Sequence, residues 1–511
     1  MTLKDNGSYD WGLVGAFYRV SYSYKGKYLL EASGRYDGNS KFPSNQRWGF
    51  FPSGSVGWRI SEENFMKNAN WLDNLKIRAS VGSAGNGLIS DAYAYLSTMS
   101  IAQSSLLNNG SVFNYTQAPS PIPKSLTWEK ATTYDLGLDF EAFNGRLNFS
   151  ADIYRKKTTD MYVVGEELPA VFGNSAPKGN YADMRTDGWE ASLSWRDSHK
   201  VAGKTLSYNI KVAVWDNTSK ITRYTAKTGT LPTNYSINYY EGMTLGEMWG
   251  YKCDGLFQSD EEAQTWANYS KFTNRSATWQ AGDPRYLDLN GDGYVNNGNN
   301  TIYDHGDLVK IGNTTPRYSY SIQGGVRWNG IGISMMWQGV GKRDWYPAKE
   351  SGYFWGQYGR PYSMALPWHN SDRWSPTNRG AYWPRLVGYS ASDSGLILAQ
   401  PNTRYVQDAS YIRLKNLTID YNFPKELVNK IGLQALKIYV SGENLLTFSP
   451  LKKYAKNYDP EGIYAGDADY GTNKFGSDNF GDGDGYLTEP NQLNRKVCSQ
   501  HIVTQIDTES I

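Results

Sequence analysis

The residues with the clearest potential for chemistry form an acidic loop at 288–293. Oxygen-bearing side chains alternate in this loop, at Asp288, Asn290 and Asp292. Such alternation followed by a glycine is the first half of a calcium-binding loop. The position for the closing bidentate Glu holds Asn299, and Asp304 or Asp307 could replace it. Two interpretations stay open: a weak calcium site, or a structured turn without metal. No other cofactor is predicted.

A second group of candidate residues is aromatic and lies in the polar stretch from Arg343 to Trp383. The candidates for ligand contact are Trp345, Tyr353, Trp355, Tyr358 and Trp368. Flat rings beside Asp, Asn and Arg suit stacking on sugar rings or contacts with a peptide. The alternative is that these rings form an interfacial belt and pack against a partner protein.

No catalytic site is predicted. The four histidines are dispersed along the chain, at His199, His305, His369 and His501, so no nucleophile system or zinc site is indicated. Adjacent acidic pairs such as Glu261-Glu262 are typical of a turn or of a helix start. The two cysteines, Cys253 and Cys498, match no metal or redox spacing.

The elements that carry these loops show a period of two. Even positions from Ala16 to Tyr24 are apolar and odd positions from Arg19 to Ser23 are polar, and the alternation resumes in 28–35 and again in 75–81. Strict alternation predicts strands with one apolar and one polar face. The chain holds roughly twelve such strands of about ten residues, the length that a tilted strand needs to cross a bilayer.

The strands come in pairs around short turns. Asn144-Gly145 separates alternating runs at 134–140 and 147–153, and Asn329-Gly330 separates 318–328 from 331–337. Asn-Gly between such runs is a strong hairpin signal. Further pairs are 189–195 with 206–214, and 417–423 with 436–440.

The connections between strands alternate in length. Short turns are predicted at 25–27, 142–145, 198–204, 329–330 and 424–434, with a longer one at 62–73. Long polar loops are predicted at 38–50, 83–130, 158–187, 216–316, 339–408 and from 447 onward. Short turns on one side and long loops on the other are typical of an outer-membrane β-barrel. A soluble sandwich or propeller has turns of more similar length.

Composition agrees with such a barrel. The 511 residues are 39% hydrophobic but 15% aromatic, with 40 Tyr and 18 Trp, as membrane strands with interfacial aromatics and polar loops require. The net charge of +2 gives no reason to expect nucleic acid as a partner. A barrel with many strands cannot fill its lumen with side chains, so we expect the apolar face to meet lipid.

Short motifs along the chain resemble the SusC/RagA-type TonB-dependent outer-membrane transporters. The resemblance rests on these segments: Tyr28-Leu29-Leu30-Glu31-Ala32-Ser33, Asp37-Gly38-Asn39-Ser40, Phe51-Pro52-Ser53, Gly57-Trp58, Leu75-Lys76-Ile77-Arg78-Ala79-Ser80, Trp128-Glu129-Lys130, Asp288-Leu289-Asn290-Gly291-Asp292-Gly293, Tyr411-Ile412-Arg413-Leu414-Lys415-Asn416, Gly442-Glu443-Asn444-Leu445 and Asp459-Pro460-Glu461. It covers residues from about 12 to about 485.

The resemblance implies an all-β protein, a transmembrane antiparallel barrel in the outer membrane of a Gram-negative bacterium. This chain would supply the C-terminal half, about twelve strands, of a roughly 22-stranded barrel. It also implies import of oligosaccharide or peptide, without enzymatic activity. The implied partners are the TonB complex, a SusD-like surface lipoprotein and outer-membrane lipid.

The chain also departs from that family. We expect residues 1–485 to be a partial barrel without signal peptide or plug, and 486–511 to be an aberrant tail. The tail lacks an alternating final strand that ends in an aromatic residue, which suggests a frameshift. Two further interpretations remain open: a passive porin or adhesin barrel, and a secreted sugar-binding or glycoside-active β-protein.

Overall fold

The computed structural model describes residues 10–463, apart from 88, 90–93, 98, 100, 109, 118, 120, 124, 167, 170, 172, 174–175, 227–228, 233–237, 267–278, 349–350, 360–365, 388–390, 392–397 and 399. The predicted boundary between barrel and tail at 485–486 lies outside these residues. None of the helices in the described ranges is long and apolar enough to span a bilayer.

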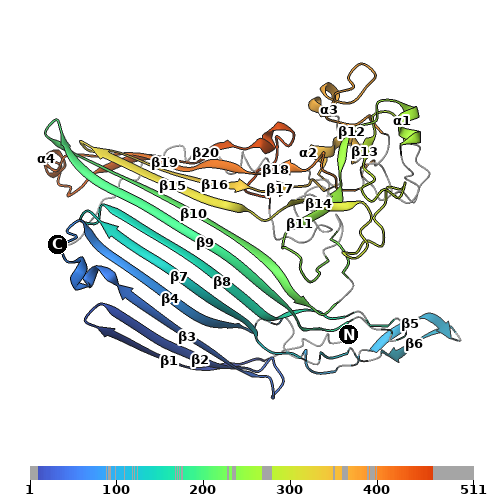
Figure 1. Ribbon diagram of the computed structural model, residues 1–511, viewed down its shortest axis with the longest axis horizontal. Helices are drawn as coiled ribbons and strands as arrows, with labels where there is room; N and C mark the ends of the chain where they lie inside the picture. Colours follow the sequence, from blue (N-terminus) through green and yellow to red (C-terminus); the bar gives the residue numbers. More distant parts are fainter. Residues whose placement is uncertain are drawn as a thin grey trace.

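One antiparallel sheet of twelve strands dominates the molecule (Figure 1). In spatial order its strands are β1 (Leu13–Tyr24), β2 (Tyr28–Asn39), β3 (Trp48–Arg59), β4 (Leu72–Asn86), β7 (Glu129–Ala142), β8 (Leu147–Val164), β9 (Lys178–Val201), β10 (Lys204–Tyr224), β15 (Arg317–Trp328), β16 (Ile331–Lys342), β19 (Tyr411–Asn422) and β20 (Lys437–Phe448). Every neighbour is the next sheet strand along the chain. The predicted all-β antiparallel architecture and its strand number are confirmed.

The register gathers the apolar side chains on one face. Ala79 pairs with Leu136, which pairs with Ile153, and Ile153 pairs with Trp189. The same face continues to the far edge, where Ile333 pairs with Ile419. A shift of one residue in any strand would move its whole apolar set to the other face. The predicted division into an apolar and a polar face is therefore present across the sheet.

Tight turns join the strands at one end. Asn329 and Gly330 both have positive φ values, 47° and 89°, as do Asn144 and Gly145, at 58° and 71°. Two successive positive φ angles favour Asn-Gly and match the twist of the flanking strands. The predicted hairpins at these positions are confirmed.

The strands are longer than expected, with 12 to 24 residues each. Parts of the loops predicted at 83–130, 158–187 and 216–316 are strand: β4 continues to Asn86, β8 to Val164 and β10 to Tyr224, and β9 begins at Lys178. Beyond the apolar band the apolar residues no longer gather on one face, so the period of two disappears while backbone pairing continues. The sequence pattern therefore marks the apolar band and not the ends of the strands.

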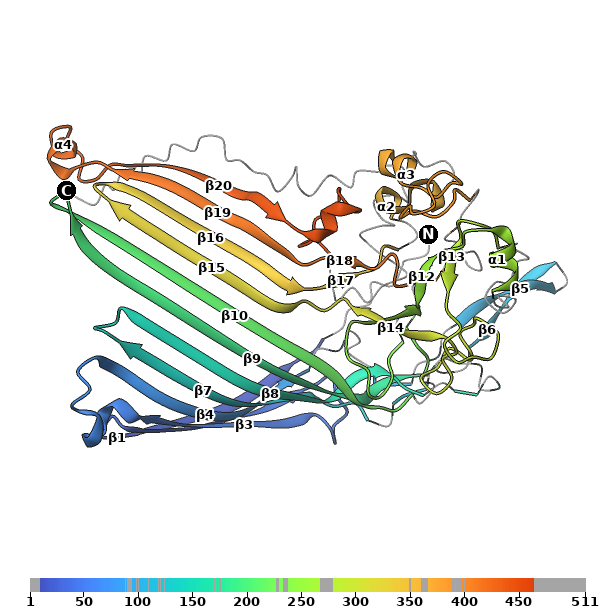
Figure 2. The same cartoon turned by 45° about the horizontal axis from the view of Figure 1, so that its top comes forward.

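The long connections form smaller elements at the other end of the sheet (Figures 1 and 2). The strands are β5 (Ile101–Asn108), β6 (Ser111–Thr116), β11 (Glu247–Tyr251), β12 (Cys253–Leu256), β13 (Pro284–Tyr286), β14 (Leu308–Asn313), β17 (Asp344–Trp345) and β18 (Gln407–Asp408). The α-helices there are α1 (Asp260–Thr265), α2 (Gly352–Trp355) and α3 (Pro367–Ser371), with 3₁₀ turns at Gly356–Tyr358 and Pro450–Lys453. At the short-turn end lie α4 (Lys425–Asn429) and the 3₁₀ turns Ile60–Glu62 and Asn64–Met66.

Candidate functional site

The long connections after β10 and β16 pack on each other into one unit, here called the loop unit. Tyr251 donates its backbone N–H to the Pro401 carbonyl at 2.8 Å, which joins the two connections. Arg385 donates to the buried Asp283 carboxylate at 2.6 Å and joins them again. Burial raises the pKa of Asp283, opposed by the adjacent Arg385 guanidinium. These contacts join the two connections into one unit.

An aromatic core stabilises the loop unit. Trp355, Tyr358, Trp383 and Tyr405 are fully or almost fully buried. Trp383 lies edge-on to Trp355 at 6.2 Å between ring centroids and stacks on Tyr405 at 5.9 Å. Large rings removed from water contribute most of the apolar burial in such a core. The loops therefore have a hydrophobic interior of their own.

His369 lies inside this core. Its ring is edge-on to Trp383 at 4.3 Å, and its Nε2 is 2.7 Å from the Phe354 carbonyl, which fixes the proton on Nε2 as a donor. Burial lowers the pKa of His369 to about 4, against the opposing effect of the Phe354 hydrogen bond. The side chain is therefore neutral at neutral pH and serves as a polar link within the aromatic core.

The five aromatic residues predicted for ligand contact lie in different environments. Trp355 and Tyr358 are buried, and their polar atoms donate to the carbonyls of Pro347 and Pro384. Their rings pack within the loop unit itself and not against a partner protein, and a role in ligand contact stays a prediction for them. Trp345, Tyr353 and Trp368 are half-buried, so a role in ligand contact stays a prediction for these three.

Trp368 is the most suitable of the three. It lies on α3, and the Lys456 ammonium is 5.7 Å from the centre of its ring. Trp345, by comparison, packs on Tyr458 at 4.8 Å and on Phe354 at 6.2 Å. A half-exposed indole beside a cation can stack on an apolar sugar face while the cation contacts hydroxyl or carboxylate groups.

The predicted calcium loop folds around its own backbone. Asp288 accepts from the N–H groups of Gly291 and Gly293 at 2.7 and 2.8 Å, and Asp292 accepts from Tyr294 at 2.8 Å. These hydrogen bonds account for the shape of the turn without a metal. In the described ranges no group of three or more His, Cys, Asp or Glu side chains is placed to hold a metal. Calcium binding at Asp288, Asn290 and Asp292 stays a prediction.

The two carboxylates considered as closing ligands differ. Asp307 is fully buried and accepts from the N–H groups of Leu289 and Asn296, at 2.7 and 2.8 Å. Asp304 accepts instead from the Asn299 amide at 2.7 Å. Asp307 thus anchors both ends of the acidic loop, whereas Asp304 belongs to the neighbouring turn.

The polar face of the sheet carries a charge network that no sequence motif indicates. Arg78 on β4 donates to Asp152 on β8 at 2.8 Å and lies 3.3 Å from both Asp135 and Asp139 on β7. One cation therefore binds three carboxylates from two strands. Period two places Arg78 on the polar face, but only strand order brings the three acids together.

The same face carries cations near the short turns. A cleft of about 660 Å³ is lined there by Arg146, Arg196, Arg327, Asp420 and Lys437, among others. Arg327 donates to Asp420 at 2.7 Å, and the Lys437 ammonium is 3.7 Å from the same carboxylate. The polar face thus has an acid-rich middle and a cation-rich end.

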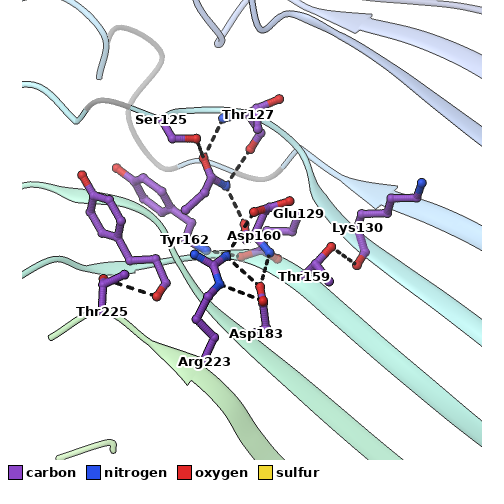
Figure 3. A network of polar contacts seen from close by, with 12 residues as sticks. Ser125, Thr127, Glu129, Lys130, Thr159, Asp160, Tyr162, Asp183, Arg223 and Thr225 are labelled. Carbon is purple, nitrogen blue, oxygen red and sulfur yellow. Dashed lines mark hydrogen bonds and ion pairs between the residues drawn. The ribbon is translucent and has the colours of Figure 1, made fainter. Parts of the chain in front are cut away.

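Polar contacts also fasten the long-loop ends of β7 to β10 (Figure 3). Arg223 binds the Asp183 carboxylate through two nitrogens at 2.7 and 2.8 Å and reaches Asp160 at 3.2 Å. The buried Asn180 accepts from the Thr127 N–H at 2.8 Å and donates to its carbonyl at 3.0 Å. These contacts make the strand ends a fixed support for the loops above them.

The sequence pattern of a known family covers most of this architecture. The family described as TonB dependent receptor-like, beta-barrel, matches residues 3–329. This chain belongs to that family. It is of the SusC/RagA type, since its relatives include the TonB-dependent receptor SusC of Bacteroides thetaiotaomicron, 29% identical over 301 residues, with 57% of this chain and 28% of SusC covered.

Other matches agree with this TonB-dependent receptor assignment. The TonB-dependent receptor P3 of Formosa agariphila is 29% identical over 467 residues, with 89% of this chain and 42% of the relative covered. The fold is that of the structure described as the RagAB peptide transporter, with a TM-score of 0.66 at 21% identity, over 89% of this chain and 45% of that one. The chain spans less than half the length of these relatives.

The family consists of receptors and transporters, which are not enzymes. The histidines in the described ranges lie apart: His199 is exposed at the short-turn end of β9, His305 lies beside Trp249, and His369 is buried. The sequence-based expectation of no catalytic site stands as a prediction. An outer-membrane location in a Gram-negative bacterium follows from the receptor family.

Proposed function

We propose that this chain forms part of the wall and the outer loops of a SusC-like importer, which carries oligosaccharides or peptides across the outer membrane with energy from TonB. The observation that carries the proposal is the two-faced sheet of a TonB-dependent receptor. One face is apolar across all twelve strands, and the other carries charges such as the Arg78 network. An apolar face suits lipid, and a charged face suits a water-filled interior.

The proposed partners act at opposite ends of the protein. A SusD-like lipoprotein would cover the loop unit, and the TonB complex would act from the periplasm. One of the similar solved structures is described as the RagAB peptide importer, and one of the curated relatives is SusC. The first description supports import of a peptide, and the second supports a receptor that depends on TonB.

The cargo would meet the half-buried aromatics of the loop unit first. Trp368 with Lys456 is the strongest candidate, because the ring and the ammonium lie together. We expect Trp368→Ala to weaken cargo binding by roughly tenfold, since loss of a stacked ring costs on the order of 1 kcal/mol or slightly more. Tyr303→Ala is the matched control, because Tyr303 is an exposed loop aromatic outside the predicted group.

The test measures uptake of the supplied cargo by cells in which the full receptor gene is deleted and by cells in which it is restored. Size-graded oligosaccharides and peptides are supplied one class at a time, with and without a protonophore. Energy-dependent uptake of one class supports the proposal and identifies the cargo. Uptake that continues without energy would identify a passive porin, and hydrolysis of the sugar in the medium would identify a secreted glycoside-active protein.

A further inference from the structure

Three cations stand side by side on the apolar face of the sheet, at its long-loop end. Lys157 on β8 pairs directly with Arg185 on β9, and Arg185 pairs with Lys220 on β10. These three residues are here called the cation row. Residues that pair directly have side chains on the same face, about 5 Å apart, and like charges in such pairs repel each other.

The carboxylates near the cation row do not neutralise it. Asp187 lies two residues from Arg185 on the same face and is shared by Arg155 and Arg185, with Arg185 at 3.0 Å. Asp183 lies two residues before Arg185 on β9, and its carboxylate is bound by Arg223 (Figure 3). In the described ranges neither Lys157 nor Lys220 has a carboxylate partner, and the Lys157 ammonium lies instead 5.8 Å from the Tyr134 ring.

The position of the row along the strands indicates what could neutralise it. On the same face of β9, Trp189 is the aromatic residue of the apolar band nearest the long-loop end, and Arg185 lies four residues earlier in the chain, further toward that end. A rise of about 3.3 Å per residue places Arg185 roughly 13 Å further along the strand. Aromatic side chains mark the level of the headgroups in a barrel. The cations therefore lie where the anionic groups of the outer leaflet begin.

We propose that the cation row binds a phosphate group of an outer-leaflet lipid. The proposal rests on the proposed function only in placing the apolar face in the outer membrane. A phosphate carries the charge and the acceptor oxygens that the row lacks, and a guanidinium between two ammonium groups can contact several oxygens at once. The lipid tail would then lie along the exposed side chains of Ile153 and Trp189.

The experiment uses the full receptor, reconstituted in phosphatidylcholine vesicles that contain either phosphorylated or dephosphorylated lipid A. Lipid retained after extraction in mild detergent is measured by native mass spectrometry. We expect the wild type to retain the phosphorylated lipid selectively. The triple variant Lys157→Gln, Arg185→Gln, Lys220→Gln should retain at least about tenfold less, since each cation near a charged surface contributes to attraction.

Two further variants separate this site from general charge and from misfolding. The control Lys25→Gln, Lys200→Gln, Lys204→Gln removes three exposed cations at the short-turn end and should retain lipid as the wild type does. Lys157→Arg with Lys220→Arg keeps the charge and should also retain it. If the triple variant does not insert into bilayers, Lys220→Gln alone is expected to reduce retention several-fold.

Several results would overturn the proposal. These are equal retention of both lipid forms by the wild type, unchanged retention by the glutamine variants, or equal loss in the short-turn control. Binding of radiolabelled inorganic phosphate by the wild type, together with equal retention of both lipid forms, would identify free phosphate as the ligand and exclude lipid. Energy-dependent cargo uptake is measured in parallel, so that lost lipid selectivity with intact uptake rejects this inference alone. Failure of the wild type to insert into bilayers would reject both proposals.

Discussion

Acidification should loosen the loop unit through His369. This side chain is only 4% exposed, and burial lowers its pKa from 6.5 to about 4. In the unfolded loop the imidazole regains the ordinary value, so between pH 6.5 and pH 4 the unfolded state binds a proton that the folded state excludes. Stability is therefore complete above pH 6.5 and decreases as the pH falls toward 4.

The size of this effect follows from the two pKa values. The full difference between 6.5 and about 4 corresponds to ~3 kcal/mol, at about 1.4 kcal/mol per pKa unit. A change from pH 7 to pH 5 covers most of it and should destabilise the loop unit by about 2 kcal/mol. Local opening of the aromatic core would then be roughly 20–30 times more frequent.

Hydrogen exchange of the full protein, followed by mass spectrometry of peptides that cover α2 and α3, measures this opening. Exchange rates are corrected for the intrinsic effect of pH. His369→Gln keeps an N–H donor for the Phe354 carbonyl but does not titrate near neutral pH, so its protection should not change between pH 7 and pH 5. His305→Gln is the control for the other loop histidine. Equal pH dependence in wild type and His369→Gln would refute the reasoning.

Three further predictions concern other contacts. Arg413→Met leaves the buried Asp459 carboxylate without its cation and should destabilise residues 449–463 by ~3–5 kcal/mol. Limited proteolysis of these residues should then be faster. The control Arg19→Met removes an exposed ion pair and should leave the proteolysis of residues 449–463 unchanged. If the acidic loop binds calcium, chelation should lower the melting temperature of the wild type but not of Asp288→Ala with Asp292→Ala; equal effects on both would exclude this site. Trp355→Ala should cost ~3–5 kcal/mol in chemical denaturation of the loop unit, and a cost comparable to that of Trp368→Ala would contradict its assignment to the core.

The sheet could be predicted from sequence because the residues of each strand alternate between apolar and polar, according to what its two faces contact. Alternation in 134–140 and 147–153 with Asn144-Gly145 between them specifies a hairpin and its register, and the structure has that hairpin. The ends of β8, β9 and β10 could not be predicted in this way. There the strands persist through backbone pairing and contacts such as Arg223 with Asp183.

The structure of the loop unit could be predicted less well from the sequence. Trp355, Tyr358 and Trp368 look equivalent in a polar stretch rich in aromatics, and the sequence offers nothing that separates buried rings from half-buried ones. Burial here depends on contacts between segments far apart in the chain, such as Tyr251 with Pro401 and Asp283 with Arg385. The network of Arg78 with three aspartates has the same origin, because it requires the order of three strands.

The two parts of the molecule use the same residue types in opposite ways. In the sheet the large apolar side chains point outward, with Ile153 59% and Val440 66% exposed, whereas in the loop unit Trp383 and Tyr405 are completely buried. The sheet therefore depends on lipid or detergent to cover its apolar face, while the loop unit is stabilised by removing its own core from water, in the manner of a soluble domain. Polar contacts at the ends of β8 to β10 lie where the two parts meet. The wall and the outer loops therefore have separate sources of stability.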